Sequence, residues 1–349
     1  MLKLSSLISG IALTFAGASV VAAQETPWAP FPLYDQSAGK STEVKFDPVT
    51  KAAKKYSFCV LVPHMQDSYW IAADYGLAAE AKRVGVKLTI LQAGGYANLS
   101  KQVSQFDDCL NSGADAILVA PISEAGLSAK FKQAADKKLP VIVFVNPVTQ
   151  SPVTSKVYVD FATKGHQTGT YLKDLMASGG KVAVFPGPQG SGWAESYLNG
   201  FKEAIAGSKV TIAAEKFGEA GVPQQLKLVE DVLQSTPDIN AIWGAAPAAE
   251  AAVGAVKEAG LSNIKIIATY ENQTMVDQLK ANKILAFATE YPVMQGRIAV
   301  DLAIKALEDG KFSPAYGIVP QMVTTANIKD LDLTQILAPA GFDPKFSVE

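Results

Sequence analysis

Residues 58–70 read FCVLVPHMQDSYW and combine a buried strand, a loop and the start of a helix. The apolar run 58–62 predicts a strand covered on both faces, and Pro63 ends it because proline cannot donate to a sheet ladder. Asp67 or Ser68 can then cap the following helix. In open α/β sheets, loops at the carboxyl ends of strands form the ligand site. The sequence therefore places a candidate site directly after this strand.

The alternation of strand and helix continues along the chain. Further strand patterns in the first half lie at 87–92, 116–120, 141–145 and 156–159, with helical patterns between most of them. The pattern restarts after Ser178-Gly179-Gly180, with strands at 181–185, 210–214, 241–244, 265–269 and 284–289. Alternation of this kind predicts mainly parallel sheets with helices on both faces.

A chain of 349 residues is long for a single core, and the restart suggests where it divides. We predict an α/β fold of two doubly wound parallel-sheet lobes joined by a multi-crossing hinge. The expected parts are a signal peptide (1–23), an extended N-terminal arm (24–54), an N-terminal lobe (55–178 plus 292–312) and a C-terminal lobe (179–291 plus 313–349).

The first 23 residues have the pattern of a cleaved secretory signal. Lys3 precedes a mostly apolar run over 7–21, and small residues stand before Gln24. A retained membrane anchor is the alternative, but the run is short and no stop-transfer charges follow it. We expect an exported protein that is not embedded in the membrane.

The arm that follows interleaves prolines with aromatic residues. Pro27, Pro30 and Pro32 argue against a regular helix or a central strand. We expect an extended segment that lies on the lobe or on a partner, and a disordered leader is the alternative.

Two cysteines, Cys59 and Cys109, would meet the oxidising conditions of an exported protein. Cys59 lies on the first predicted strand, and Cys109 lies near the end of a helix that crosses back over that sheet. A disulfide between them is geometrically allowed, and two reduced, buried thiols are the alternative.

Charge and motifs restrict the function classes. With 31 basic and 33 acidic residues and no basic stripe, the chain does not have the composition of a nucleic-acid-binding protein. The turn at 186–190 matches neither phosphate-binding fingerprint. A nucleophile elbow, a zinc-binding helix and paired-cysteine motifs are also missing from the sequence. We predict a binding protein with no cofactor and no enzymatic activity; catalysis in the cleft is the competing class.

The layout over about residues 55–330 resembles the ribose-type periplasmic binding proteins. Within that group, several motifs resemble the periplasmic partners of trimethylamine N-oxide sensor histidine kinases, namely Asp67-Ser68-Tyr69-Trp70, Ala93-Gly94-Gly95-Tyr96, Pro186-Gly187-Pro188, Gly200-Phe201 and Ala248-Ala249-Glu250-Ala251-Ala252. The resemblance implies a periplasmic protein that binds trimethylamine N-oxide and presents it to a membrane sensor kinase. A solute-binding component of an ABC importer, for a sugar or another small polar solute, is the alternative.

The strand-end loops are rich in aromatic residues and contain two acids that suit a methylated amine. Aromatic faces attract a quaternary ammonium by roughly 0.5 to 2 kcal/mol per well-placed ring. A carboxylate can supply counter-charge, and a tyrosine hydroxyl or indole N–H can donate to the oxide. For each ring alone, core packing is the alternative. The expected ligand-binding residues are Asp67, Tyr69, Trp70, Tyr96, Phe161, Trp193, Tyr270, Glu290 and Tyr291.

The chain departs from the family at one of these positions. The resemblance implies a tryptophan where this sequence has Phe161. Phenylalanine keeps an aromatic face but has no N–H donor, so another residue would have to bind the oxide.

Overall fold

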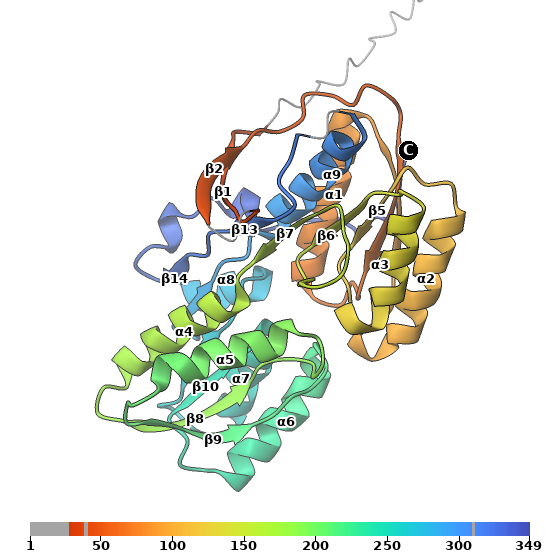
Figure 1. Ribbon diagram of the computed structural model, residues 1–349. Helices are drawn as coiled ribbons and strands as arrows, with labels where there is room; N and C mark the ends of the chain where they lie inside the picture. Colours follow the sequence, from red (N-terminus) through yellow and green to blue (C-terminus); the bar gives the residue numbers. More distant parts are fainter. Residues whose placement is uncertain (1–27, 38–40, 309–310) are drawn as a thin grey trace, which may run out of the picture.

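The computed structural model describes residues 28–37, 41–308 and 311–349 (Figure 1). The predicted signal peptide and the first residues of the arm, 24–27, lie outside the described residues. Within the described ranges, none of the helices has both the length and the apolar character needed to cross a bilayer.

The first lobe is built on a mixed sheet. In the described part of the chain its strand order is β15-β4-β3-β5-β6-β7-β13-β1-β2. The parallel strands are β3 (Ser57–Val62), β4 (Lys87–Gln92), β5 (Ala116–Val119), β6 (Val141–Phe144), β7 (Ser155–Val159) and β13 (Tyr316–Ile318). Antiparallel strands complete the two edges, namely β1 (Phe31–Asp35), β2 (Thr42–Phe46) and β15 (Ser347–Val348).

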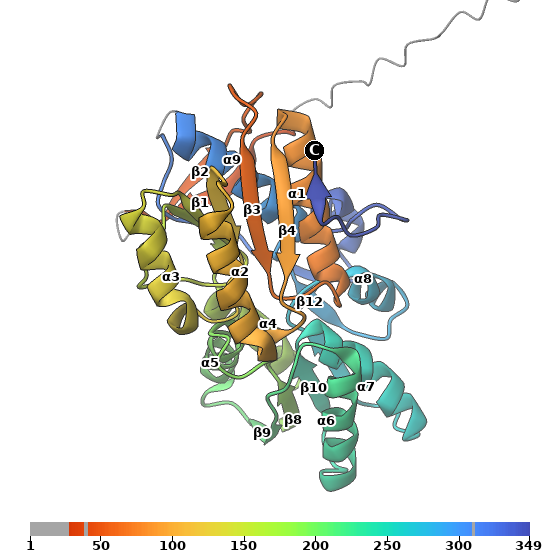
Figure 2. The ribbon, with the colours of Figure 1, turned by 90° about the vertical axis from the view of Figure 1, so that its right-hand side faces the viewer.

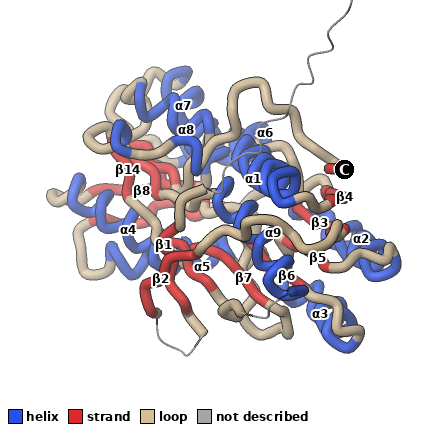
Figure 3. Tube along the Cα trace, turned by 90° about the horizontal axis from the view of Figure 1, so that it is seen from above, coloured by secondary structure: helices blue, strands red, loops and turns tan. Residues whose placement is uncertain are grey.

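Helices cover both faces of this sheet. Helices α1 (Ser68–Val84) and α9 (Pro292–Glu308) lie on one face, and α2 (Leu99–Asn111) and α3 (Glu124–Asp136) lie on the other (Figure 3). Successive side chains of β3 therefore enter different cores: Val60 packs in the main core and Leu61 in a smaller cluster with residues of α2 and α3. This alternation follows from the pleat of the strand.

The second lobe repeats the arrangement. Its sheet has the order β14-β12-β11-β10-β8-β9 among the described strands. The parallel strands are β8 (Gly180–Phe185), β9 (Val210–Glu215), β10 (Ala241–Gly244), β11 (Lys265–Ala268) and β12 (Ala286–Ala288), and β14 (Met322–Thr324) is antiparallel. Its helices are α4 (Phe161–Leu175), α5 (Trp193–Ile205), α6 (Val222–Ser235), α7 (Ala246–Glu258) and α8 (Gln273–Lys280). The predicted fold class, two mainly parallel α/β lobes, is confirmed.

The chain passes between the lobes more than once. It leaves the first sheet after β7, returns between β12 and α9, and crosses again between β13 and β14. Short 3₁₀ helices also lie in the described loops: η1 (Tyr96–Asn98), η2 (Ile328–Asp330) and η3 (Leu333–Gln335).

Two parts of the predicted lobe boundaries differ from the structure. Helix α4, expected in the first lobe, packs against α5 of the second, so closely that a Cβ at Gly165 would lie 2.0 Å from the Tyr197 carbonyl oxygen. Strands β13 and β15, expected in the second lobe, pair with β7 and β4 of the first sheet. Hydrophobic periodicity identifies an element but does not specify which sheet it joins.

The N-terminal arm forms a hairpin, β1–β2, and not an irregular segment. The prolines were expected to exclude an inner strand, yet β1 lies between β13 and β2. Pro32 is opposite Lys45, while pairing with β13 begins only at Leu33. The missing N–H of Pro32 therefore lies beyond the end of that ladder. The arm is also anchored by Trp28, whose indole N–H donates to Glu80 at 3.0 Å.

A disulfide joins Cys59 on β3 to Cys109 on α2. Both residues are buried in the smaller cluster under α2 and α3. The bond closes a loop with a sequence separation of 50 residues.

We predict that replacing both cysteines by alanine lowers the free energy of unfolding by about 4 kcal/mol, because the unfolded chain regains the entropy of a loop of this length. Chemical denaturation of the wild type and the double variant measures this difference. A reductant should destabilise the wild type and leave the double variant unchanged. Equal sensitivity of both proteins would contradict a stabilising disulfide.

Candidate functional site

A small cavity lies between the lobes. Strands β3 and β4 point their carboxyl ends toward the second lobe (Figure 2). The cavity is narrow: the volume within it that the centre of a water molecule can occupy is about 20 Å³. Its walls comprise Tyr69, Trp70, Tyr96, Val145 and Asn146 from the first lobe, Phe161, Trp193, Tyr197, Ala220 and Tyr270 from the second, and Glu290 from the crossover that leads into α9.

Aromatic rings make up most of this wall, and they contact one another edge to face. Ring centroids are 5.2 Å apart for Tyr69 and Tyr270 and 5.7 Å for Tyr96 and Trp193. Trp193 and Tyr197 are 5.9 Å apart. Edge-to-face packing is a favoured arrangement of aromatic side chains. The rings therefore support one another around the space that they enclose.

A buried ion pair lies beside the rings. Nζ of Lys164, on α4, is 2.6 Å from Oε1 of Glu290, and the two side chains are 0% and 4% exposed. The Tyr69 hydroxyl donates to the other Glu290 oxygen at 2.7 Å, and the Tyr197 hydroxyl donates to Oε1. Burial lowers the pKa of Lys164, while the charge of Glu290 acts in the opposite direction. One carboxylate thus holds residues from both lobes.

A second buried carboxylate supports the crossover. Glu271 accepts the backbone N–H groups of Glu290 and Tyr291, each at 2.8 Å. Burial raises the pKa of Glu271 to about 7, and the charge of Lys164 opposes this shift. When both carboxylates are ionised, this cluster has two negative charges and the single positive charge of Lys164. The electrostatics favour a guest with positive charge on its surface.

Asp67 does not line the cavity, contrary to its expected contact with ligand. It is the N-cap of α1 and accepts the Tyr69 N–H at 3.0 Å. It also accepts the Tyr270 hydroxyl and the Asn272 amide N–H, each at 2.8 Å. Because these partners come from the second lobe, Asp67 connects the two lobes and fixes the hydroxyl end of Tyr270. Burial raises the pKa of Asp67.

Tyr291 is also outside the cavity. Its backbone has a φ of 57°, and its ring packs edge to face against Phe31 of the arm at 5.3 Å. The left-handed backbone and this packing turn the Tyr291 ring toward the arm, so the structure places Glu290 in the cavity wall and Tyr291 outside it.

The other seven predicted positions line the cavity: Tyr69, Trp70, Tyr96, Phe161, Trp193, Tyr270 and Glu290. The sequence reasoning missed Tyr197, Asn146 and the buried Lys164. Tyr197 was detectable, since it lies four residues after Trp193 and therefore on the same helix face. Asn146 follows a strand end in the same way as the predicted residues. Nothing in the sequence marked Lys164 as buried.

The hydroxyl groups of the cavity tyrosines already have partners. Besides the contacts of Tyr69, Tyr197 and Tyr270, the Tyr96 hydroxyl accepts the Asn146 amide N–H at 3.0 Å. In contrast, the buried indole N–H of Trp193 forms no hydrogen bond of regular geometry among the described residues, although it lies close enough to the Tyr96 hydroxyl to lower the pKa of that group. A buried donor without an acceptor is costly, so Trp193 is suited to bind an oxygen of a guest.

His64 supports the wall without adding charge. Its ring contacts those of Trp70 and Tyr96, with centroids 6.0 and 5.7 Å away. Burial lowers its pKa to about 4, so the imidazole is neutral at pH 7.

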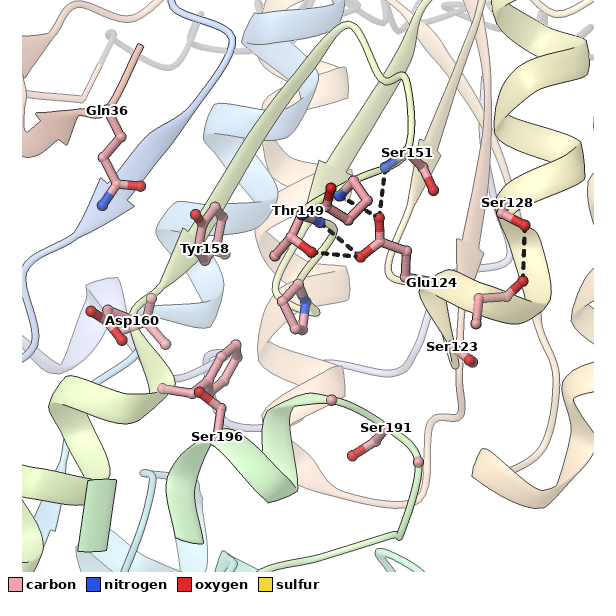
Figure 4. A pocket seen from close by; sticks show the side chains of 17 residues that line it. Gln36, Ser123, Glu124, Ser128, Thr149, Ser151, Tyr158, Asp160, Ser191 and Ser196 are labelled. Carbon is pink, nitrogen blue, oxygen red and sulfur yellow. Dashed lines mark hydrogen bonds between the residues drawn. The ribbon is translucent and has the colours of Figure 1, made fainter. Parts of the chain in front are cut away.

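A wider groove of about 750 Å³ shares Phe161 with the inner cavity, and Figure 4 shows its lining. Hydroxyl-bearing residues, among them Ser123, Thr149 and Tyr158, line much of it. Its Glu124 carboxylate accepts the N–H groups of residues 149–151 at 2.7 to 2.8 Å, so it organises a loop. This groove lacks the dense ring lining of the inner cavity.

Comparison with known proteins identifies the family. Residues 58–311 match a family described as the periplasmic binding protein domain. The chain belongs to the periplasmic binding protein family. It is 33% identical to the periplasmic protein TorT of Escherichia coli K12 over 299 residues, which cover 85% of this chain and 86% of TorT.

Solved periplasmic binding proteins have the same fold. An ABC transporter solute-binding protein from Bradyrhizobium sp. BTAi1 with bound Bis-Tris is 40% identical, with a TM-score of 0.78 and coverage of 92% of this chain and 99% of that one. The complex of the TorS sensor domain with TorT in the presence of trimethylamine N-oxide contains a chain 28% identical, with a TM-score of 0.75 and coverage of 84% and 100%. The protein is periplasmic, and it is a binding protein and not an enzyme, as the sequence predicted.

The raised pKa of the buried Glu271 implies that the stability of this periplasmic binding protein depends on pH. Its pKa is about 7 when folded and 4.5 when unperturbed, so between these values the folded state retains a proton that the unfolded state has lost. This group therefore makes the free energy of unfolding fall as pH rises from 4.5 to about 7.

We predict that Glu271→Gln removes this contribution. Denaturation of both proteins from pH 4 to pH 8 tests it: the wild type should lose stability relative to the variant as pH rises toward 7. A difference that does not change with pH would contradict the assignment.

Proposed function

We propose that this protein senses trimethylamine N-oxide, or a closely related methylated amine, and presents it to the periplasmic domain of a membrane sensor histidine kinase. The observation that carries the proposal is the inner cavity, in which seven aromatic side chains surround a small space beside the buried carboxylate of Glu290.

The cavity chemistry matches the two ends of the N-oxide. The methyl groups have partial positive charge and suit the aromatic faces, and the carboxylate of Glu290, together with that of Glu271 when it is ionised, adds to that attraction. The oxide requires a donor, and the unpaired indole N–H of Trp193 can supply it. Phe161 keeps its ring in the wall, so Trp193 compensates for the N–H that phenylalanine lacks.

A sugar fits this lining less well. Every hydroxyl of a buried polyol needs a hydrogen-bond partner, and an unsatisfied group costs about 1 to 3 kcal/mol. The four cavity tyrosines already use their hydroxyls to contact Glu290, Asp67 and Asn146. Few polar groups remain to bind a ring of hydroxyls.

The similarity to TorT supports the proposed partner, since TorT forms a complex with the TorS sensor domain. Ligand binding would favour the closed arrangement of the lobes, and the receptor would respond to that arrangement. The size of the response is limited by the difference in ligand affinity between the two arrangements.

An importer component is the second candidate, because the similar Bradyrhizobium protein is an ABC transporter solute-binding protein. Its bound Bis-Tris is a tertiary amine, which suits an aromatic cavity as well. Co-purification with a sensor-kinase periplasmic domain supports sensing, whereas co-purification with a permease supports import.

We predict that calorimetry on the mature protein detects binding of trimethylamine N-oxide and no binding of ribose. Trp193→Phe should lower the affinity for the N-oxide by about ten- to a hundredfold, because it removes a hydrogen bond to a charged oxygen. The same variant should lose less affinity for tetramethylammonium, which has no oxygen, than for the N-oxide, because only the ring contribution changes.

Trp28→Phe is the matched control, since the Trp28 indole N–H donates to Glu80 and Trp28 does not line the cavity. Its affinity for the N-oxide should equal that of the wild type. Binding of ribose with no heat from any methylated amine would refute the proposal.

A further inference from the structure

The loop between β9 and α6 of the second lobe reaches across to the first. Ala220 in this loop lines the cavity. The neighbouring Glu219 directs its carboxylate away from its own lobe, and Oε2 accepts the backbone N–H of Tyr96 at 3.1 Å. A side chain of one lobe thus bonds the backbone of a cavity residue in the other.

The second lobe holds this loop firmly. The buried Gln225 of α6 donates from its amide nitrogen to the carbonyl oxygens of Gly218, at 3.0 Å, and Glu219, at 2.9 Å. The N–H of Gly218 donates to Gly187 at 3.0 Å. These bonds fix the position from which the Glu219 side chain extends.

The first lobe presents a helix start without a side-chain cap of its own. Gly95 is the N-cap residue of η1, which begins at Tyr96, and no side chain of η1 caps it. The N–H groups of Gly94 and Gly95 both donate to the Pro63 carbonyl oxygen. Gly95 has a φ of 143°, and a Cβ there would lie 3.6 Å from Glu219 Oε2. Glycine permits both this backbone and the approach of the carboxylate.

The contact acts on a residue of the cavity wall. Asn146 holds the hydroxyl end of Tyr96, and Trp193 packs against its ring. Glu219 holds the backbone end. A hydrogen bond to an ionised carboxylate is stronger than one between neutral groups, so Glu219 suits this backbone N–H. Any separation of the lobes would break the Glu219 bond and free the backbone of Tyr96.

We propose that Glu219 is a positioning residue that latches the closed form: it caps η1 from the opposite lobe, holds Tyr96 against the cavity and slows ligand release without touching the ligand. Only the choice of trimethylamine N-oxide as probe rests on the proposed function.

Glu219→Ala tests the latch through the kinetics of binding. We expect trimethylamine N-oxide to dissociate about tenfold faster, as for a lost charge-assisted hydrogen bond, with an association rate that does not fall. Glu219→Gln keeps an oxygen acceptor and should dissociate at an intermediate rate. An unchanged dissociation rate in the alanine variant would overturn the proposal.

Hydrogen exchange of the Tyr96 amide, measured both without ligand and at saturating trimethylamine N-oxide, tests the same contact separately. We expect faster exchange at Tyr96 in Glu219→Ala and unchanged exchange in the interior of α2. Asp115→Ala is the matched control, because Asp115 accepts the Ser57 N–H at 2.8 Å within the first lobe. It should leave exchange at Tyr96 and ligand release unchanged.

These outcomes separate the two proposals. If trimethylamine N-oxide gives no binding heat but exchange at Tyr96 rises in Glu219→Ala, the proposed ligand is wrong and the latch stands. If the N-oxide binds and Tyr96 exchange at saturating N-oxide is the same in both proteins, the latch is wrong.

Discussion

The buried ion pair between Lys164 and Glu290 is the constraint on which the site depends. A buried charge is costly unless it is paired and hydrogen-bonded, and removing one partner of such a pair typically costs about 3 to 5 kcal/mol. Glu290 meets this requirement by accepting Lys164 and the hydroxyls of Tyr69 and Tyr197. The same bonds fix two aromatic rings, one from each lobe. Charge compensation and cavity shape are therefore parts of one network.

The network also determines which kind of small molecule the cavity lining suits. Because the cavity tyrosines use their hydroxyls to satisfy buried carboxylates and Asn146, they present mainly their rings to the interior. Glu271 adds a second carboxylate behind the crossover. The result is a small aromatic space beside two buried carboxylates, with the indole N–H of Trp193 in its wall. Such a space discriminates by the shape and charge of the guest more than by a count of hydroxyls.

The sequence predicted much of this arrangement. Strand-end loops could be located because apolar runs ended at prolines, glycines and polar residues, and parallel strands bring such loops to one edge. The structure brings Tyr69, Tyr96 and Trp193 into one cavity wall, as this logic predicted. Tyr291 lies outside the cavity, because its ring packs against Phe31 of the arm, a contact that no local pattern shows. Asp67 also lies outside it, because this cap residue bonds Tyr270 of the other lobe.

The remaining differences arise from long-range contacts. Lys164 lies on a helix whose sequence does not show which sheet it covers, so neither its burial nor its pairing with Glu290 was predictable. Strands β13 and β15 are short, and their partners lie more than 150 residues earlier in the chain. The local sequence pattern determines where such elements begin and end, whereas long-range packing determines which sheet they join or cover.

A crystal structure of the protein with trimethylamine N-oxide tests the central claim most directly. The account predicts the ligand in the inner cavity, with its methyl groups against the rings, its oxygen within hydrogen-bonding distance of the Trp193 indole nitrogen, and the Lys164–Glu290 pair intact. A ligand in the wider groove beside Glu124, or an inner cavity rearranged to expose the tyrosine hydroxyls to it, would contradict the account.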